Sequence, residues 1–189
     1  MTSHQLINQT SGDVEYYTDP RIIEAARRVM GRIALDPASS EKANQFVKAE
    51  AWFGPEDRSL ERGWDAPLWL NHPFGRKEPA CPAGCTKKHT HHSIEYFGNA
   101  AWINRLVYSH KDRSVDEACC ITYACTSEKW FQPLMEFAQC FLCPRTNYYL
   151  PDGTIKKGVT KGSVVTYLGQ NLKQFVKEFT PFGAVKVKA

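Results

Sequence analysis

The apolar run PLWLN at residues 67–71 decides the fold class, because it is short, unbroken and followed at once by a polar turn. Consecutive apolar side chains without alternation predict a strand that is covered on both faces. Further strands are predicted at residues 33–36, 118–124, 140–143 and 163–168, with a last edge strand at 185–187. Because doubly covered strands are typical of parallel sheets, these runs predict an α/β fold.

Helical patterns lie between the predicted strands. Thr18-Asp19-Pro20 opens the first helix, with Thr18 or Asp19 as its cap and Pro20 in the first turn, and Gly31 ends it. More helices are predicted over residues 41–52, 94–110 and 172–179, and after Ser127. This alternation predicts a mostly parallel sheet with helices on both faces. Such a sheet binds ligands at the carboxyl ends of its strands, which directs attention to Asp36, Asn71 and the segment after Ala124.

Composition indicates an ordinary globular protein. The chain has 189 residues, of which 42% are hydrophobic and 23% charged, which excludes a disordered chain, a coiled coil and a collagen-like repeat. We expect a flexible N-terminus over residues 1–15 and one domain over 16–189, with a Cys/His-rich insert at about 76–93. No apolar run is long enough for a membrane span and no signal peptide is evident, so we expect a cytoplasmic protein without a membrane partner.

Charge and cysteine content bear on partners and compartment. Residues 1–70 carry 8 basic and 11 acidic side chains, whereas residues 71–189 carry 16 basic and 9 acidic ones. The basic surplus of the second part is compatible with a nucleic-acid partner and equally with a solvated basic face. Seven cysteines, an odd number, favour a reduced compartment.

The predicted strand at 67–71 leads directly into Asn71-His72-Pro73-Phe74. This segment resembles the (Asp/Asn)-Pro-Pro-(Tyr/Phe) motif of methyltransferases that act on exocyclic amines of nucleic-acid bases. Such an amine is a poor nucleophile, because its lone pair is delocalised into the ring. The resemblance implies that the Asn71 side chain and the His72 carbonyl accept the two amine hydrogens, which frees the lone pair, while Phe74 stacks on the extruded base.

His72 departs from the motif, where proline is usual. The exchange keeps the backbone carbonyl, loses the rigidity of proline and gains a titratable imidazole. A purely structural interpretation is that Asn71 caps a turn and Phe74 belongs to the core.

Six further segments, in order over residues 16–170, make the chain similar to the phage-type DNA adenine methyltransferase family, which is Dam-like. They are YTDP at 17–20, LDPAS at 35–39 with Asn44 after it, EDRSL at 56–60 with Trp64, ACTSEKWF at 124–131, and the pair FLCPR at 141–145 and KGSVV at 161–165 with Leu168-Gly169. Cys125 and Pro144 stand where that family usually has Arg and Gly. The resemblance implies activity in the bacterial cytosol.

The same resemblance implies a Rossmann-like class I fold and S-adenosylmethionine as cofactor. Asp36, followed by Pro37 and Ala38, would contact the methionine or ribose part of the cofactor. Tyr17-Thr18 would lie near its methionine carboxylate, and Asp57 would reach its adenine. Asp36 as a cap and Asp57 as a solvated loop acid are the alternatives. No GxGxxG loop is present.

The insert concentrates zinc-type ligands in a short polar segment. Cys81, Cys85 and His89, with either His91 or His92, supply the four thiolate and imidazole ligands of a tetrahedral structural zinc site. A reduced loop without metal is the alternative.

Basic residues near these motifs are candidates for DNA contact. In the insert they are Arg76, Lys87 and Lys88, which we expect to meet phosphates. A second basic loop, with aromatic residues among the cations, contributes Arg145, Tyr148, Lys156 and Lys157. The alternative for this loop is a hairpin with a solvated basic edge.

The sequence therefore predicts a DNA adenine methyltransferase. Two other functions stay open: the same fold acting on cytosine or a modified base, and an inactive scaffold that only binds DNA. A hydrolase is disfavoured, because no Ser/His/Asp or Cys/His arrangement has a recognisable spacing.

Overall fold

The computed structural model describes residues 16–86, 95–150, 152–156, 159 and 161–188. The predicted strand around PLWLN is β3, Leu68–Leu70, and all three of its side chains are fully buried. Leu68 and Leu70 pack into one hydrophobic cluster and Trp69 into another, on opposite faces of the sheet. Burial on both faces explains why the run is continuously apolar.

Seven strands form one sheet in the order β2-β1-β3-β4-β8-β5-β9. Their bounds are β1 Leu35–Asp36, β2 Ala51–Trp52, β3 Leu68–Leu70, β4 Ala118–Tyr123, β5 Ala138–Leu142, β8 Ser163–Leu168 and β9 Gly183–Lys186. The pairs from β2 to β4 are parallel, and the pairs β4/β8, β8/β5 and β5/β9 are antiparallel. Five of the seven strands point the same way, so the prediction of a mostly parallel α/β sheet is confirmed, and the antiparallel part makes it mixed.

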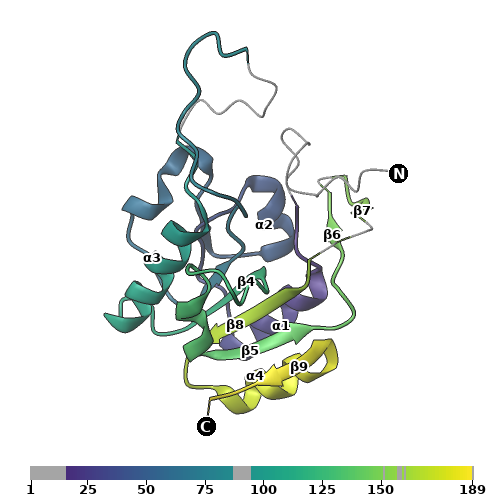
Figure 1. Ribbon diagram of the computed structural model, residues 1–189. Helices are drawn as coiled ribbons and strands as arrows, with labels where there is room; N and C mark the ends of the chain where they lie inside the picture. The colour runs from purple at the N-terminus through teal and green to yellow at the C-terminus, as the bar shows by residue number, and fades with distance from the viewer. Residues whose placement is uncertain (1–15, 87–94, 151, 157–158, 160, 189) are drawn as a thin grey trace.

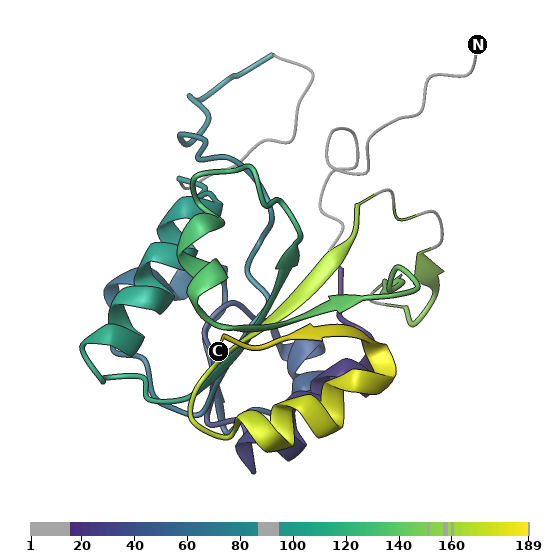
Figure 2. The ribbon, with the colours of Figure 1, turned by 60° about the horizontal axis from the view of Figure 1, so that its bottom comes forward.

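Helices cover both faces, as predicted (Figure 2). Their bounds are α1 Pro20–Met30, α2 Glu41–Val47, α3 Asn99–Lys111 and α4 Leu172–Phe179. Side chains of α1 and α4 share a cluster with Trp69, Cys119 and Ile121, whereas α3 packs with Leu68, Leu70 and Cys120. The alternation of Cys119 and Cys120 between the two clusters places β4 in the middle layer of a three-layer fold.

Local chemistry explains the ends of α1. The Asp19 side chain accepts a hydrogen bond from the Arg21 backbone N–H at 2.9 Å, and Pro20 occupies the first turn. Gly31 ends the helix with φ of 79°, a left-handed conformation that suits glycine. The predicted bounds of this helix are confirmed.

Two helix predictions are wrong in extent and one in type. The helix predicted over 41–52 ends at Val47, because Lys48 turns left-handed and the Asn44 side chain bonds the Ala49 backbone through both its polar atoms. Residues 51–52 form β2 instead. The helix predicted from 94 begins at Asn99, and that expected after Ser127 is a 3-10 helix, η3, Gln132–Glu136, in which Pro133 lacks an N–H.

Short elements complete the described chain. They are the 3-10 helices η1 Pro55–Asp57, η2 Ser59–Glu61 and η4 Thr180–Phe182, and the two-stranded hairpin of β6 Tyr148–Tyr149 and β7 Ile155–Lys156. The hairpin stands outside the main sheet, and Tyr149 pairs with Tyr17 through two backbone hydrogen bonds of 2.8 and 2.9 Å. The hairpin and the insert rise from the same side of the molecule (Figure 1). No described helix combines the length and apolar character that a membrane crossing requires.

Candidate active site

The carboxyl ends of β1 and β3 meet where the chain reverses its direction across the sheet. From β1 the chain passes through α2 to β2 on one side, and it then returns to β3 on the other side of β1. Ligands of open α/β sheets bind at such a switch point. Asp36 is the last residue of β1 and Asn71 directly follows β3, so the structure brings two predicted site residues to this position.

Asn71 is half-buried, and its amide orientation is set by a backbone group far away in sequence. Its Nδ2–H donates to the carbonyl oxygen of Tyr16 at 3.4 Å. Because the amide has its donor and acceptor on opposite arms, Oδ1 is turned away from Tyr16 and keeps its accepting capacity. Tyr16 was not predicted to contribute to the site, since a carbonyl 55 residues distant in sequence leaves no pattern.

Aromatic rings surround the end of the motif. The half-buried Phe74 ring lies 4.6 Å from the Tyr123 ring at the end of β4, centroid to centroid. The Lys161 ammonium lies 5.2 Å from the centroid of the same Tyr123 ring. Pro73 is exposed. The arrangement offers aromatic surface and a cation beside the Asn71 amide, and Tyr123 was not predicted.

His72 is the buried member of the motif, with 1% of its surface exposed. Its Nδ1 lies 3.0 Å from the carbonyl oxygen of Pro73, so Nδ1 carries the proton. The ring stacks on Trp102 at 6.2 Å with an interplanar angle of 8°. Burial lowers the pKa of His72 to about 4, and the imidazole is therefore neutral near pH 7. The titratable group expected at this position does not change charge in the neutral range.

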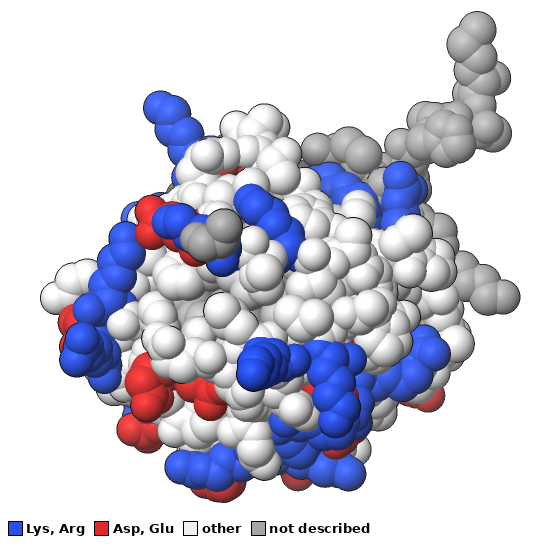
Figure 3. Space-filling model, turned by 90° about the horizontal axis from the view of Figure 1, so that it is seen from below, with Lys and Arg blue, Asp and Glu red and all other residues white. Residues whose placement is uncertain are grey.

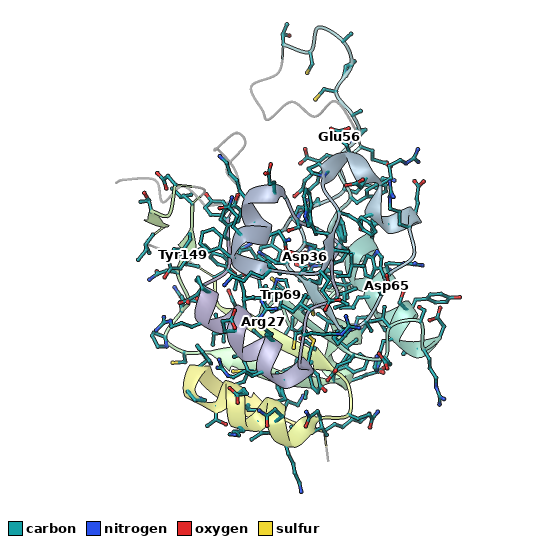
Figure 4. All side chains as sticks on the ribbon, turned by 180° about the vertical axis from the view of Figure 1, so that it is seen from behind. Arg27, Asp36, Glu56, Asp65, Trp69 and Tyr149 are labelled. Carbon is teal, nitrogen blue, oxygen red and sulfur yellow. The ribbon has the colours of Figure 1, made fainter. Side chains whose placement is uncertain are left out.

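Asp36 is a buried acid, 2% exposed, and lies near the centre of the molecule with Trp69 (Figure 4). Its Oδ1 accepts a hydrogen bond from the Ala38 backbone N–H at 3.2 Å. Burial raises the pKa of Asp36 to about 7, because no described cation pairs with the carboxylate to offset desolvation. Pro37 is buried and Ala38 half-buried beside it. Interactions with the Ser39 side chain and the Ala38 backbone lower the pKa of Asp36 by less than burial raises it. A buried carboxylate without a cationic partner favours a cationic or hydroxyl-bearing ligand.

Tyr17 and Thr18 are both buried just before α1. The Tyr17 ring packs 5.6 Å from Phe46 of α2, and its backbone pairs with the hairpin. The Thr18 hydroxyl finds no hydrogen-bond partner within the described chain. An orphaned buried hydroxyl and a buried acid are the polar groups that the methionine end of S-adenosylmethionine requires, so the residues present fit this cofactor.

The Asp57 carboxylate is hydrogen-bonded and ion-paired within its own loop. Its Oδ2 accepts from the Gly54 backbone N–H at 2.7 Å, and its Oδ1 pairs with the Arg62 guanidinium at 3.3 Å. These bonds close the 3-10 turn after β2. The carboxylate predicted to reach the cofactor adenine is thus already engaged in the loop.

Hydrogen bonds join the two ends of the insert at its base. Glu78 and Tyr96 exchange two backbone hydrogen bonds of 2.9 and 2.8 Å. The Asn99 backbone N–H donates to the Gly75 carbonyl at 3.0 Å, and the Gly75 N–H donates to the Asn99 side-chain oxygen at 3.2 Å. Cys81 and Cys85 are half-buried, and neither forms a disulfide. His89, His91, His92, Lys87 and Lys88 lie outside the described residues. Within the described part, no three metal-ligating side chains converge.

The predicted DNA-contact residues differ in exposure. Arg76 and Arg145 are exposed, Lys156 lies in β7, and Lys157 is outside the described chain. Tyr148, which was predicted to contact DNA, is buried, and its hydroxyl hydrogen-bonds the Ser163 hydroxyl at 2.9 Å. Lys173 and Lys177 of α4 are also exposed, and basic side chains gather on the face opposite the insert (Figure 3).

The described cavities do not coincide with this site. One of about 500 Å³ lies at the amino edge of the sheet and is lined by Arg28, Val29, Met30, Gly31, Asp116, Glu117, Gln170, Asn171 and Gln174. Comparison with protein-family models, with curated proteins and with solved structures found no match to this chain.

Proposed function

We propose that the protein is a Rossmann-like class I methyltransferase that transfers a methyl group from S-adenosylmethionine to the exocyclic amine of a base in DNA, with adenine as the target. One observation carries the proposal. The Asn71 amide, oriented by the Tyr16 carbonyl, stands beside the Phe74–Tyr123 ring pair at the switch point of an α/β sheet.

The residues of the chain activate the amine. Asn71 Oδ1 accepts one amine hydrogen and the His72 carbonyl accepts the other, so the nitrogen becomes tetrahedral and its lone pair becomes available. Phe74 stacks on the base once the base has left the duplex. The neutral His72 ring adds no positive charge beside this amine.

Thr18 and Asp36 would hold the cofactor, with Tyr17, Pro37 and Ala38 next to them. S-adenosylmethionine, when bound, supplies an electrophilic methyl group on a cationic sulfur. The Thr18 hydroxyl gains a partner on binding, and a cation near Asp36 favours the ionised carboxylate that burial opposes.

Exposed basic residues support DNA as the partner. Arg76 enters the insert, and Arg145 precedes the β6–β7 hairpin, which rises from the same side of the molecule (Figure 1). Lys161 is exposed beside Tyr123 at the candidate site. Cations on both projections are suited to the phosphates that flank an extruded base.

Nucleoside mass spectrometry tests the proposal. Unmethylated DNA is incubated with the protein and S-adenosylmethionine, digested and analysed. We expect N6-methyladenine. Methylated cytosine would keep the mechanism and change the base, and no new nucleoside from folded protein would refute methyl transfer.

A DNA-binding scaffold without catalysis is the second candidate, and the engagement of the Asp57 carboxylate within its own loop favours it. The 500 Å³ cavity lies away from Asn71 and Asp36. Calorimetric titration with S-adenosylmethionine separates the two functions, because a scaffold that has lost catalysis would bind DNA and leave the cofactor unbound.

A further inference from the structure

A continuous series of stacked groups supports the Asn71–Phe74 motif. It begins at Arg105, whose guanidinium lies 5.5 Å from the Trp64 ring, and Trp64 stacks on Trp102 at 6.2 Å. Trp102 stacks on His72, and the His72 ring meets Phe74 edge-on at 5.2 Å. The series connects α3 and the segment after η2 to the candidate site through one imidazole.

Two interactions fix the His72 ring. Stacking on Trp102 sets its plane, and the Nδ1–H donates to the Pro73 carbonyl and ties the ring to the next peptide of the turn. Trp102 is itself buried on α3, whose first turn is hydrogen-bonded to Gly75. The turn is therefore held at His72 and again at Gly75.

We propose that His72 is a positioning residue, an imidazole clamp that holds the Asn71–Phe74 turn in the geometry required for amine activation. In the motif that this segment resembles, the ring of a proline constrains the same backbone position covalently. Here a hydrogen bond and a ring stack impose the constraint. The effect on catalysis rests on the proposed methyl transfer, whereas the clamp itself is a property of the free protein.

The clamp requires one protonation state. The Pro73 carbonyl is an acceptor only, so the proton must stay on Nδ1, and Nε2 keeps its lone pair in a buried position without a described partner. Protonating Nε2 would bury an unpaired charge. The low pKa of His72, about 4, agrees with a ring that stays neutral while it holds the turn.

Four variants separate the two interactions. His72→Ala removes both, His72→Phe keeps a ring to stack, His72→Asn keeps a short donor, and His72→Pro restores the covalent constraint. His72 donates no backbone hydrogen bond within the described chain, so proline removes none. Misplaced reacting groups lower kcat steeply, and we expect about a 50-fold fall in kcat for His72→Ala with the KM for S-adenosylmethionine within about threefold.

Rescue distinguishes positioning from general destabilisation. We expect His72→Pro to recover kcat to within about tenfold of the wild type, and His72→Phe and His72→Asn to lie between Ala and Pro. An unchanged kcat in His72→Ala, or a folded His72→Pro no more active than His72→Ala, would overturn the proposal.

Nitrogen-15 NMR of the wild-type protein tests the clamp without catalysis, with His72→Phe used to assign the ring signals. We expect the Nδ1–H tautomer at pH 7 and no titration down to pH 5. An Nε2–H tautomer, or titration near pH 6.5, would refute the clamp whatever the activity. The expected tautomer in a protein that transfers no methyl group would refute the proposed function and leave the clamp intact.

Discussion

The parallel and antiparallel parts of the sheet have similar cores, but they differ in the residues at the carboxyl ends of their strands. The inner strands of both parts are buried on two faces, and β4 and β8 are paired over six residues. At the carboxyl ends of the parallel strands β1, β3 and β4 lie Asp36, Asn71 and Tyr123. The antiparallel strands β5 and β9 are followed by the exposed Cys143 and Val187.

This comparison distinguishes polar side chains that stabilise the fold from polar side chains that are available to a ligand. In the antiparallel part, Tyr167 donates its hydroxyl hydrogen to Glu117 and accepts one from the Asn171 backbone. Gln139 Nε2 donates to the Thr166 hydroxyl, whereas Gln139 Oε1 and Thr122 Oγ1 find no partner within the described chain. In the parallel part, Asp36 and Thr18 are buried with little or no pairing. Unsatisfied polar groups are costly to the free protein, so their presence favours a ligand site.

The largest contrast expected is between Asn71 and Asn171. Both amides donate to a backbone carbonyl, Asn71 to Tyr16 at 3.4 Å and Asn171 to Val29 at 3.2 Å. If Asn71 accepts an amine hydrogen in the transition state, Asn71→Ala should lower kcat by about 10³-fold, or about 4 kcal/mol. Asn171→Ala, measured by the same single-turnover assay, should leave kcat within about threefold. Equal effects would remove the distinction between the two parts of the sheet.

Replacing either of two phenylalanines by alanine should have opposite effects, one mainly on stability and the other mainly on kcat. Phe175 of α4 is fully buried between Tyr167 and Phe179, so Phe175→Ala should lower the free energy of unfolding by about 3 kcal/mol through a cavity. The folded enzyme should keep its kcat. Phe74 is only half-buried. When both effects are expressed as free energies, Phe74→Ala should therefore cost more in kcat than in the free energy of unfolding. Urea titration and steady-state kinetics on both variants measure the pair.

Continuous apolar runs and clear caps made part of the fold predictable. β3, β4 and β8 are long or fully buried, and α1 carries both end signals. β2 was missed because its two residues are exposed at the sheet edge and follow a helical pattern. One feature of the sequence could have predicted the antiparallel part of the sheet. No helix separates the apolar runs at 140–143 and 163–168, and only antiparallel neighbours dispense with a crossover helix.

The site was predictable where its residues follow strands. Asp36 and Asn71 were found from their position after apolar runs, and the structure places them at neighbouring strand ends. The Tyr16 carbonyl, Tyr123 and Trp102 were missed, because contacts between distant segments leave no local pattern. The behaviour of the His72 ring depends on its burial, which the turn-forming neighbours Asn71 and Pro73 do not indicate.

Asp36 should make stability depend on pH in the direction opposite to a salt-bridged acid. Its pKa is raised to about 7 in the folded protein, so between about pH 4 and 7 the folded state holds a proton that the unfolded state releases, and stability falls as pH rises through that range. Asp36→Asn should therefore stabilise the protein at pH 8 by about 1–3 kcal/mol, with the gain vanishing near pH 4.

Denaturant unfolding at pH 5 and 8 measures this dependence, with exposed Asp65→Asn as the control that leaves it unchanged. If Asp36 belongs to the cofactor site, the more stable Asp36→Asn variant should bind S-adenosylmethionine more weakly in calorimetric titration. Tighter binding by the variant would place the cofactor elsewhere and would assign Asp36 to the fold alone.

The smallest effect on stability is expected in the insert, which lies outside both parts of the sheet. If Cys81 and Cys85 ligate zinc with the neighbouring histidines, Cys81→Ser should abolish the bound zinc measured by mass spectrometry of the purified protein. Exposed Cys143→Ser, at the end of β5, should leave it unchanged. Because residues 76–84 are almost all exposed, the unfolding temperature set by the core should shift by only about 1–3 °C. A wild-type protein without zinc would identify the insert as a reduced loop, and a shift as large as that of Phe175→Ala would make the insert part of the core.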